Sequence, residues 1–165
     1  RLAFAQMGRR MIYSRLLANI WLHYWGTFVH KLWVASFLLR ICGRLLLRAV
    51  LHDCSKCFPS EAQGFIRVIH RLTHSTYGSE EYRACLRSIK PSVTLHYQRN
   101  RHHPEHFPRG VKDMNLIDMT EMWCDWRAAV KRHDDGDIKK SIIHNTGRFQ
   151  LGDVLPEIFR NEVMK

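Results

Sequence analysis

Apolar residues that recur three and four positions apart constrain the fold of this chain most strongly. The spacing appears in two N-terminal stretches, Ile12-Leu16-Leu17-Ile20 and Phe28-Leu32-Ala35-Leu38-Leu39. It follows the period of 3.6 residues of an α-helix with one buried face. No segment alternates with the period of two that a β-strand shows. The sequence therefore predicts an all-α protein, with about seven to nine helices.

Glycine, proline and capping residues predict where these helices begin and end. Gly26 and Gly43 are expected to separate two N-terminal helices, and a third, short helix is expected to end at His52 and Asp53. Ser60 and Gln63 have the spacing of a capping box, which predicts a helix from Ser60 to about His74. Further boundaries are expected at Ser79, Pro91, Asn115, Asp137 and Asp153, with helices over 92–101 and from Leu116 to about His133.

Basic residues are concentrated in the first third of the chain. The sequence has 26 Lys and Arg against 15 Asp and Glu, a net charge of +11, and no acidic residue precedes Asp53. Aromatic residues are interleaved with the basic ones, among them Trp21, Trp25 and Trp33. Such a segment suits RNA, an anionic surface or a large protein assembly, and the alternative is a solvated face of amphipathic helices.

Charge and cysteine content predict the compartment. The longest stretch of the N-terminal region without Lys, Arg, Asp or Glu is Leu16–His30, 15 residues, whereas a membrane span needs about 20. Five cysteines, an odd number, indicate an intracellular, reducing compartment, and the Cys54-x-x-Cys57 pair alone is weak evidence for a metal or redox site. The acid-free start at Arg1 is typical of a chain processed for the mitochondrial matrix, or of part of a longer chain.

The segment Leu51-His52-Asp53-Cys54-Ser55-Lys56 carries the first candidate metal ligands. At the end of a helix the side chains of His52 and Asp53 can reach one ion, because the helical constraint is relaxed there. An imidazole beside a carboxylate suits Mn, Fe, Co or Zn. A chance His-Asp pair on a solvated surface is the alternative.

Two further segments supply imidazoles and carboxylates. His96, Asn100 and His103 are four and seven positions apart, so a helix would point them at one place, and His102 and His106 lie beside them. A solvated or RNA-facing loop is the alternative for His102 and His106. Asp118, Glu121 and Asp125 share a second stripe, and like charges at this spacing repel unless a cation neutralises them. Asp118 also suits the first turn of its helix.

Four sequence motifs, taken together, resemble the HD superfamily of helical, metal-dependent phosphohydrolases. They are Val29-His30-Lys31, Leu51-His52-Asp53-x-Ser55-Lys56, Asn100-x-His102-His103-Pro104-Glu105 and Glu121-Met122-x-x-Asp125-Trp126-x-Ala128-Ala129. They are most similar to an uncharacterised family of small, often phage-encoded HD-like proteins, although Cys57 replaces the usual aromatic residue. The resemblance implies an HD-like domain over 28–150, a basic amphipathic extension over 1–27, and a C-terminal helix over 151–165 packed on the domain.

The resemblance also implies roles for individual residues. The expected metal ligands are His30, His52, Asp53, His96, His102 or His103, and Asp125, which would hold one or two divalent transition ions such as Mn, Fe, Co or Zn. Lys56 would contact phosphate, Asp53 would bridge the ions or orient the nucleophile, and Glu121 would support Asp125. His23 is the reserve for His30, whose spacing alone also suits helix packing.

These roles predict a phosphohydrolase that acts on a phosphorylated small molecule, with nucleotides the expected class. Two other functions fit the same sequence. One is a structural subunit of a large assembly, such as a mitochondrial ribosome or a respiratory complex, which the acid-free N-terminal third favours. The other is a redox di-iron centre, because some HD-like proteins with two metal ions are oxygenases.

Overall fold

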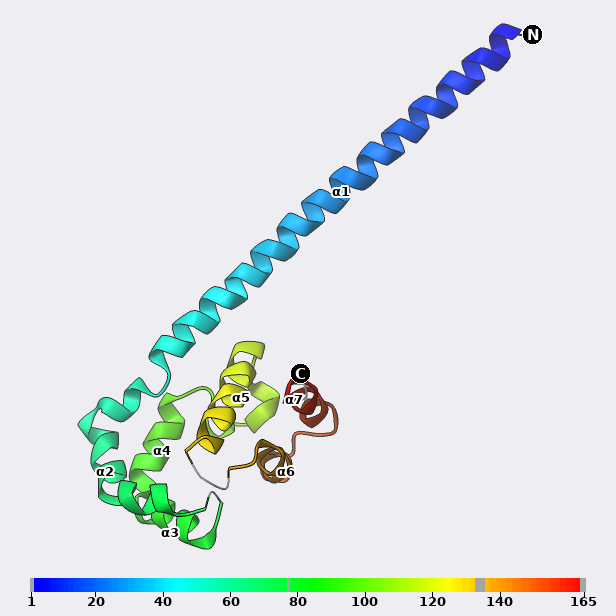
Figure 1. Ribbon diagram of the computed structural model, residues 1–165. Coiled ribbons are helices and arrows are strands. Elements are labelled where there is room, and N and C mark those ends of the chain that lie inside the picture. The colour runs from blue at the N-terminus through cyan, green and yellow to red at the C-terminus, as the bar shows by residue number, and fades with distance from the viewer. Residues whose placement is uncertain (1, 77, 133–135, 164–165) are drawn as a thin grey trace. The chain divides into compact units, whose positions relative to one another are not determined.

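The computed structural model describes residues 2–76, 78–132 and 136–163, with side chains from Arg15 onward. Within these ranges the chain is all-α, as predicted, and contains no strand. Figure 1 shows the seven α-helices and the short segments that join them. The elements are α1 (Leu2–Leu51), η1 (Cys54–Cys57), α2 (Pro59–His74), α3 (Glu80–Ser88), α4 (Lys90–Arg99), η2 (Pro104–His106), η3 (Gly110–Asp113), α5 (Leu116–Val130), α6 (Ile138–Phe149) and α7 (Val154–Val163), where η marks a 3-10 helix.

Helix α1 is one uninterrupted helix of 50 residues, so the predicted division at Gly26 and Gly43 is wrong. A glycine inside a helix costs about 1 kcal/mol relative to alanine, which weakens a helix without ending it. Within the described part of the first unit, nothing lies within 4 Å of a Cβ placed on either glycine. The helix ends where it was expected to end, immediately before His52.

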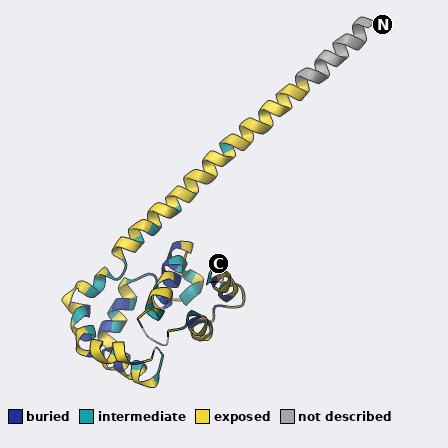
Figure 2. Cartoon of the chain, in the orientation of Figure 1, coloured by how far each residue is buried: buried dark blue, intermediate teal, exposed yellow. Residues whose placement is uncertain are grey.

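The chain divides into two units, residues 1–44 and 45–165. In the first unit, nearly every side chain from Arg15 to Arg44 is exposed (Figure 2). No described helix combines the length and the hydropathy that crossing a membrane requires, as the sequence predicted.

The second unit contains two apolar clusters. The larger is formed by α5, α6 and α7 around Met122, Trp126, Ile142 and Phe159, and Trp123 stacks on Phe159. The smaller is formed by α2, α3 and the start of α4; its buried members are Val68, Cys85 and Ile89. Helix α7 therefore packs on α5 and α6 through Phe159.

Three of the four capping predictions that the structure addresses are confirmed. Ser79 accepts a hydrogen bond from the amide of Tyr82, Asn115 forms a capping box with Asp118, and Asp137 caps α6. The prediction for Ser60 is wrong, because α2 begins at Pro59 and Phe58 is the N-cap residue. Proline suits the first helical position, where its missing N–H has no partner to lose. Helix α5 is described to Val130, and the predicted end at His133 lies outside the described residues.

Candidate metal centre

The centre is formed by three segments that are far apart in the sequence. His52 and Asp53 lie at the end of α1, and Asp125 lies on α5. His96 lies in the last turn of α4, and the chain turns beyond it at Asn100. This turn returns His102 and His103 to His96, so the imidazoles meet although α4 does not continue as the expected helical stripe.

Asp53 adopts a left-handed backbone conformation, with φ 56° and ψ 11°. This conformation commonly ends a helix and is usually supplied by glycine, because a Cβ atom is strained there. Asp53 therefore ends α1 at a cost of roughly 1–2 kcal/mol that glycine would avoid. In return, Asp53 places a carboxylate in the candidate centre, which glycine could not do.

Imidazole Nε2 atoms from three segments surround the Asp53 carboxylate. The Nε2 atoms of His96 and His102 lie 3.4 Å and 3.5 Å from Oδ1 of Asp53. The Nε2 atom of His52 lies 3.6 Å from the other oxygen and 3.5 Å from Oδ1 of Asp125. His103 adjoins them, with its Nε2 2.8 Å from Nε2 of His96. Each of these nitrogens has a lone pair available when its own proton is on Nδ1.

The spacing of these atoms fits a metal ion. Oδ1 of Asp53 is buried and accepts no hydrogen bond, which is costly for a carboxylate oxygen without a cation. Ligand atoms bound about 2.0–2.1 Å from an ion lie about 3 to 3.4 Å apart. The observed separations of 3.4–3.6 Å are close to that range. The residues present therefore fit a metal ion on both geometry and chemistry.

Carboxylates on the opposite side of the rings hold the imidazoles in this orientation. One oxygen of Glu121 lies 3.0 Å from Nδ1 of His52 and 3.2 Å from Nδ1 of His102. Glu61 stands in the same relation to His96, at 3.1 Å from its Nδ1. An ionised carboxylate only accepts hydrogen bonds, so each Nδ1 donates, and the Nε2 of a neutral ring is then left for an ion. Carboxylates behind metal-binding histidines commonly fix the tautomer in this way.

Three groups of described residues could each hold a metal ion. They are Asp53 with His96, His102 and His103; His52 with Asp53 and Asp125; and His52 with His102 and Glu121. The first two use Nε2 atoms and share Asp53, whereas the third uses the Nδ1 side. Because Glu121 already accepts from both rings, we assign it to orientation.

The histidines differ in their electrostatic environment. Hydrogen bonds with Asp125 and Glu121 raise the pKa of His52 to about 10. Burial raises the pKa of the Glu121 carboxyl, but hydrogen bonds from His102 and His52 outweigh it and lower that pKa to about 2. Burial lowers the pKa of His96 and of His103, which keeps both rings neutral at pH 7. A metal ion needs neutral imidazoles, and at His52 it has to displace a proton.

Lys56 lies at the edge of the centre. Its ammonium is 2.5 Å from Oδ2 of Asp53 and 5.4 Å from the centroid of the Phe65 ring. It lines a cavity of about 150 Å³ together with His96, His103 and Asp125. Burial raises the pKa of Asp53, but the Lys56 ammonium together with His52 and His96 outweighs it, and the pKa is lowered. Asp53 is therefore ionised at neutral pH.

Asp118 has a structural role in place of a metal-binding one. Its two oxygens accept hydrogen bonds from Arg48, from Arg101 and from the amide of Asn115, and the side chain is fully buried. Arg48 also donates to Glu121, at 2.9 Å. This guanidinium neutralises two members of the carboxylate stripe on α5, which explains how they are accommodated on one face.

The structure thus brings together His52, Asp53, Lys56, His96, His102, His103, Glu121 and Asp125. His30 and the reserve candidate His23 are exposed residues of the first unit and belong to none of the described groups. Their metal binding stays a prediction. None of the groups contains a cysteine, and Cys54 and Cys57 are free thiols.

Sequence reasoning missed Glu61 and Arg48. Glu61 was interpreted as part of a capping box, yet its fully buried carboxylate accepts from Ser55 and Arg99 as well as facing His96. Arg48 is four positions before His52, so it lies one helical turn from that residue on the same face. This spacing is the signal that could have found it.

The fold and the centre define an all-α protein with a histidine and carboxylate cluster that could hold a metal ion. The chain belongs to a family of unknown function (DUF5662), whose sequence model matches residues 19–165. No curated protein and no solved structure matches the chain. The matched range includes every residue of the cluster.

Proposed function

We propose that the protein is a metal-dependent phosphohydrolase related to the HD superfamily, acting on nucleotides or similar phosphoesters. The observation that carries the proposal is the buried, unpartnered oxygen of Asp53, with Nε2 atoms of two histidines within 3.5 Å of it. A lysine, Lys56, lines the adjoining cavity. Imidazoles, carboxylates and an ammonium are the groups that hydrolysis of a phosphoester at a metal centre requires.

The ion or ions would be held by His52, Asp53, His96, His102, His103 and Asp125, and the donor set suits Mn, Fe, Co or Zn. When bound, a divalent ion lowers the pKa of a coordinated water and polarises a phosphoryl oxygen. The two groups that contain Asp53 give room for either one ion or two. Asp53 is common to both groups and is the bridging candidate.

The chain's own residues have separate tasks in this reaction. Lys56 neutralises the charge on the phosphoryl oxygens, because its ammonium lines the cavity beside the cluster. Asp125 is partly exposed and lines the same cavity, where the carboxylate oxygen that does not hold an ion would accept a proton from water. The oxygen of that water would bond to phosphorus as the P–O ester bond breaks, and the leaving alkoxide would take up the proton that Asp125 accepted. Glu121 and Glu61 orient the imidazoles and touch no substrate.

Elemental analysis of protein purified without added metal tests the first part of the proposal, and a phosphoester panel tests the second. We expect a transition metal in the protein, and turnover of at least one nucleotide after loading with Mn, Fe, Co or Zn. Lys56→Ala should keep the metal and lose turnover, because the ammonium acts on the substrate. Arg67→Ala, at an exposed position of α2 away from the cavity, is the control.

Absence of metal from the purified protein, combined with no effect of chelator on melting, contradicts metal binding. Full metal loading with no hydrolysis of any phosphoester contradicts the catalytic role alone. In the second case the metal has a structural role, as metal ions do in many folds.

A second candidate function is a subunit of a large protein assembly, which the surface of α1 favours. Trp21, Trp25, Phe28, Leu32 and Leu39 lie on one face at helical spacing and are each more than half exposed. The described side chains of residues 15–44 include four basic residues and no acidic one. An apolar groove flanked by acidic groups on a protein partner would complement this helix.

Co-sedimentation in extracts of the source cells, with and without ribonuclease, tests this candidate. Trp21→Ser with Trp25→Ser removes a stacked pair from α1 and should release the chain from the assembly. The control, Ile66→Ser with Ile143→Ser, removes two exposed apolar residues from the second unit and should leave the chain bound to the assembly. Release by ribonuclease alone would indicate RNA as the partner instead.

A further inference from the structure

We propose that the substrate of this centre is a single-stranded nucleic acid, whose reacting phosphate lies at the cluster and whose neighbouring nucleotides follow a basic groove away from it. This inference rests on the proposed function and names its substrate class. It is carried by three adjoining cavities in the second unit, by the charges along them and by the aromatic rings between them.

The cavity beside the cluster is too small for a whole ligand of ordinary size. Its volume is about 150 Å³, below the roughly 300–1,000 Å³ of typical small-molecule sites. It adjoins a second cavity of about 430 Å³, and the two share Tyr82, Leu86 and Arg148 as lining residues. A ligand with its phosphate at Lys56 therefore extends past Tyr82 into the second cavity.

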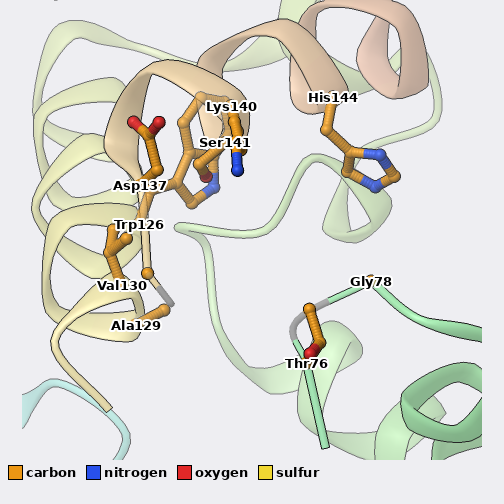
Figure 3. Close-up of a pocket in the computed structure, with 10 residues that line it drawn as sticks. Thr76, Gly78, Trp126, Ala129, Val130, Asp137, Lys140, Ser141 and His144 are labelled. Atoms are coloured by element: carbon orange, nitrogen blue, oxygen red, sulfur yellow. The ribbon is translucent and has the colours of Figure 1, made fainter. Parts of the chain in front are cut away.

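A third cavity, of about 190 Å³, continues the same path. It shares Trp126 and Ala129 with the first cavity, and Gly78 and His144 with the second. Figure 3 shows this end: α6 carries Lys140 and His144, and Thr76 and Gly78 come from the connection between α2 and α3. The three cavities thus form one groove that begins at the metal cluster.

Positive charge predominates along the groove. The described lining residues include six permanent cations, Lys56, Arg83, Arg87, Arg132, Lys140 and Arg148, and only two carboxylates, Asp125 and Asp137. Asp125 belongs to the cluster, and Asp137 caps α6 by accepting from the amide of Lys139. A row of cations that continues beyond one phosphate site suits a chain of phosphates more than a mononucleotide.

The described acidic residues that pair with these cations hold them weakly. Glu80 pairs with both Arg83 and Arg87, and all three side chains are more than half exposed. Glu105 pairs with Arg148 through one guanidinium nitrogen. Exposed pairs of this kind are weak and exchange readily with other anions. A phosphate backbone can therefore replace Glu80 at both arginines.

Aromatic rings stand where the cavities meet. Tyr82 lines the first and second cavities, and Trp126 lines the first and third. Phe65, Tyr97 and Phe149 line the first cavity as well. Trp126 is buried in the core and forms only a wall of the groove, whereas Phe65, Tyr82 and Tyr97 are partly exposed. Exposed rings between cationic sites provide surfaces on which unpaired bases stack, whatever their sequence. Double-stranded nucleic acid lacks such unpaired bases, so we commit to a single strand.

The test uses the full chain and two matched pairs of substitutions. Arg83→Gln with Arg87→Gln removes two cations four residues apart on α3, at the groove. Arg67→Gln with Arg71→Gln removes two exposed cations four residues apart on α2, and neither lines the groove. Because both variants keep α1, any contribution of that basic helix to binding is the same in each.

Binding is measured first, with a fluorescent 12-nucleotide single strand of DNA or RNA and metal-free protein. The α3 pair should weaken binding about tenfold at low salt and lower the slope of log affinity against log salt by about 1.4, that is, about 0.7 for each of two phosphates that the protein no longer neutralises. The α2 pair should change affinity less than twofold. Comparison of the DNA and RNA strands shows which of the two sugars is preferred.

Hydrolysis is measured second, as kcat/KM for a terminally phosphorylated oligonucleotide relative to the mononucleotide. The α3 pair should lower this ratio, and the α2 pair should leave it unchanged. If the α3 pair and the α2 pair have equal effects, or if the α3 pair leaves the kcat/KM ratio unchanged, the proposed groove is wrong. If no phosphoester is hydrolysed but binding still depends on Arg83 and Arg87, the proposed hydrolase activity fails while the nucleic-acid site stands.

Discussion

The candidate metal centre and helix α1 depart from ordinary folding in opposite directions. In and around the candidate centre the chain buries ionisable side chains: Glu61 and Asp118 are fully buried, and His102 is 2% exposed. Along α1 it exposes apolar groups, with Leu39 71% and Trp33 62% exposed. Burying charge costs free energy unless it is paired, and exposing apolar area forgoes about 25 cal/mol per Å². Neither arrangement is the one that folding stability alone would favour.

The two regions differ in how far the chain itself satisfies them. In the centre, Arg48, Arg99 and Arg101 neutralise the buried carboxylates, and a single oxygen of Asp53 is left without a partner. On α1, by contrast, nearly every apolar side chain from Arg15 to Arg44 is left exposed. We therefore expect the centre to be sensitive to single substitutions and α1 to be insensitive, and four predictions test this contrast.

The largest effect is expected from removing His52 and Asp53. Changing both residues to Ala should abolish metal binding and lower the melting temperature of the purified protein, because a ligand that binds only the folded state stabilises it by about 2.7 kcal/mol at 100 times its Kd. Elemental analysis and thermal melting measure the two effects. His70→Ala with His74→Ala, an exposed pair on α2, is the control and should keep both values. Metal retained by the first variant would contradict the assignment.

A smaller effect is expected at the carboxylates behind the histidines. Glu121→Gln should weaken metal binding about 10- to 100-fold, the usual cost of losing such a partner. Glu61→Gln should cost less, because Glu61 orients only one imidazole whereas Glu121 orients two. Competition with a chelating dye measures both affinities, and exposed Glu157→Gln is the control. The reverse order would contradict the assignment of Glu121 as the partner that orients two of the imidazoles.

The next prediction concerns pH. The pKa of His52 is raised to about 10 without metal, so this ring carries a proton from pH 7 up to that value and the ion must displace it. Metal affinity should therefore rise with pH, by about tenfold per unit for the one proton released. Isothermal titration in two buffers of different ionisation enthalpy measures the proton count. Loss of this dependence in His52→Gln would support the assignment, and an unchanged dependence would contradict it.

The smallest effect is expected on α1. Leu39→Ala should change the free energy of unfolding by less than about 0.5 kcal/mol, as exposed positions usually do. Met122→Ala, in the core between α5, α6 and α7, should cost about 2–5 kcal/mol. Urea denaturation of the purified protein compares them. A decrease above about 1 kcal/mol for Leu39→Ala would show that α1 is already packed in solution, for example against a second copy of the chain.

The sequence predicted the helical class because apolar periodicity is a local property that each helix carries by itself. It also predicted the end of α1 and, through the capping preference of Ser79 and Asn115, the starts of α3 and α5. It failed at Gly26 and Gly43, since a glycine costs too little to end a helix whose neighbours favour it. Helix propensity measures how strongly each residue type favours a helix, but it does not by itself determine where a helix ends.

The candidate ligands could be identified from the chemistry of their side chains, but the residues that support them could not. Histidine and aspartate in this order suggest ligands before any fold is known. The pairing of Glu61 with His96 joins positions 35 residues apart, and that of Arg48 with Glu121 joins positions 73 apart. Such pairs depend on how α2, α4 and α5 pack, which no local pattern encodes. Metal binding by His30 cannot be decided from a local pattern either, and it stays a prediction.

The left-handed backbone at Asp53 has an evolutionary consequence. Among the other residues, asparagine and glycine adopt this conformation most readily, and each is reached from an aspartate codon by a single base change. Either replacement would remove the charged oxygen between the histidines and still end α1 correctly. A descendant of this chain is thus one mutation from losing a carboxylate that the centre depends on while keeping its architecture. Within one family, members with this carboxylate and members without it can arise from each other by that step.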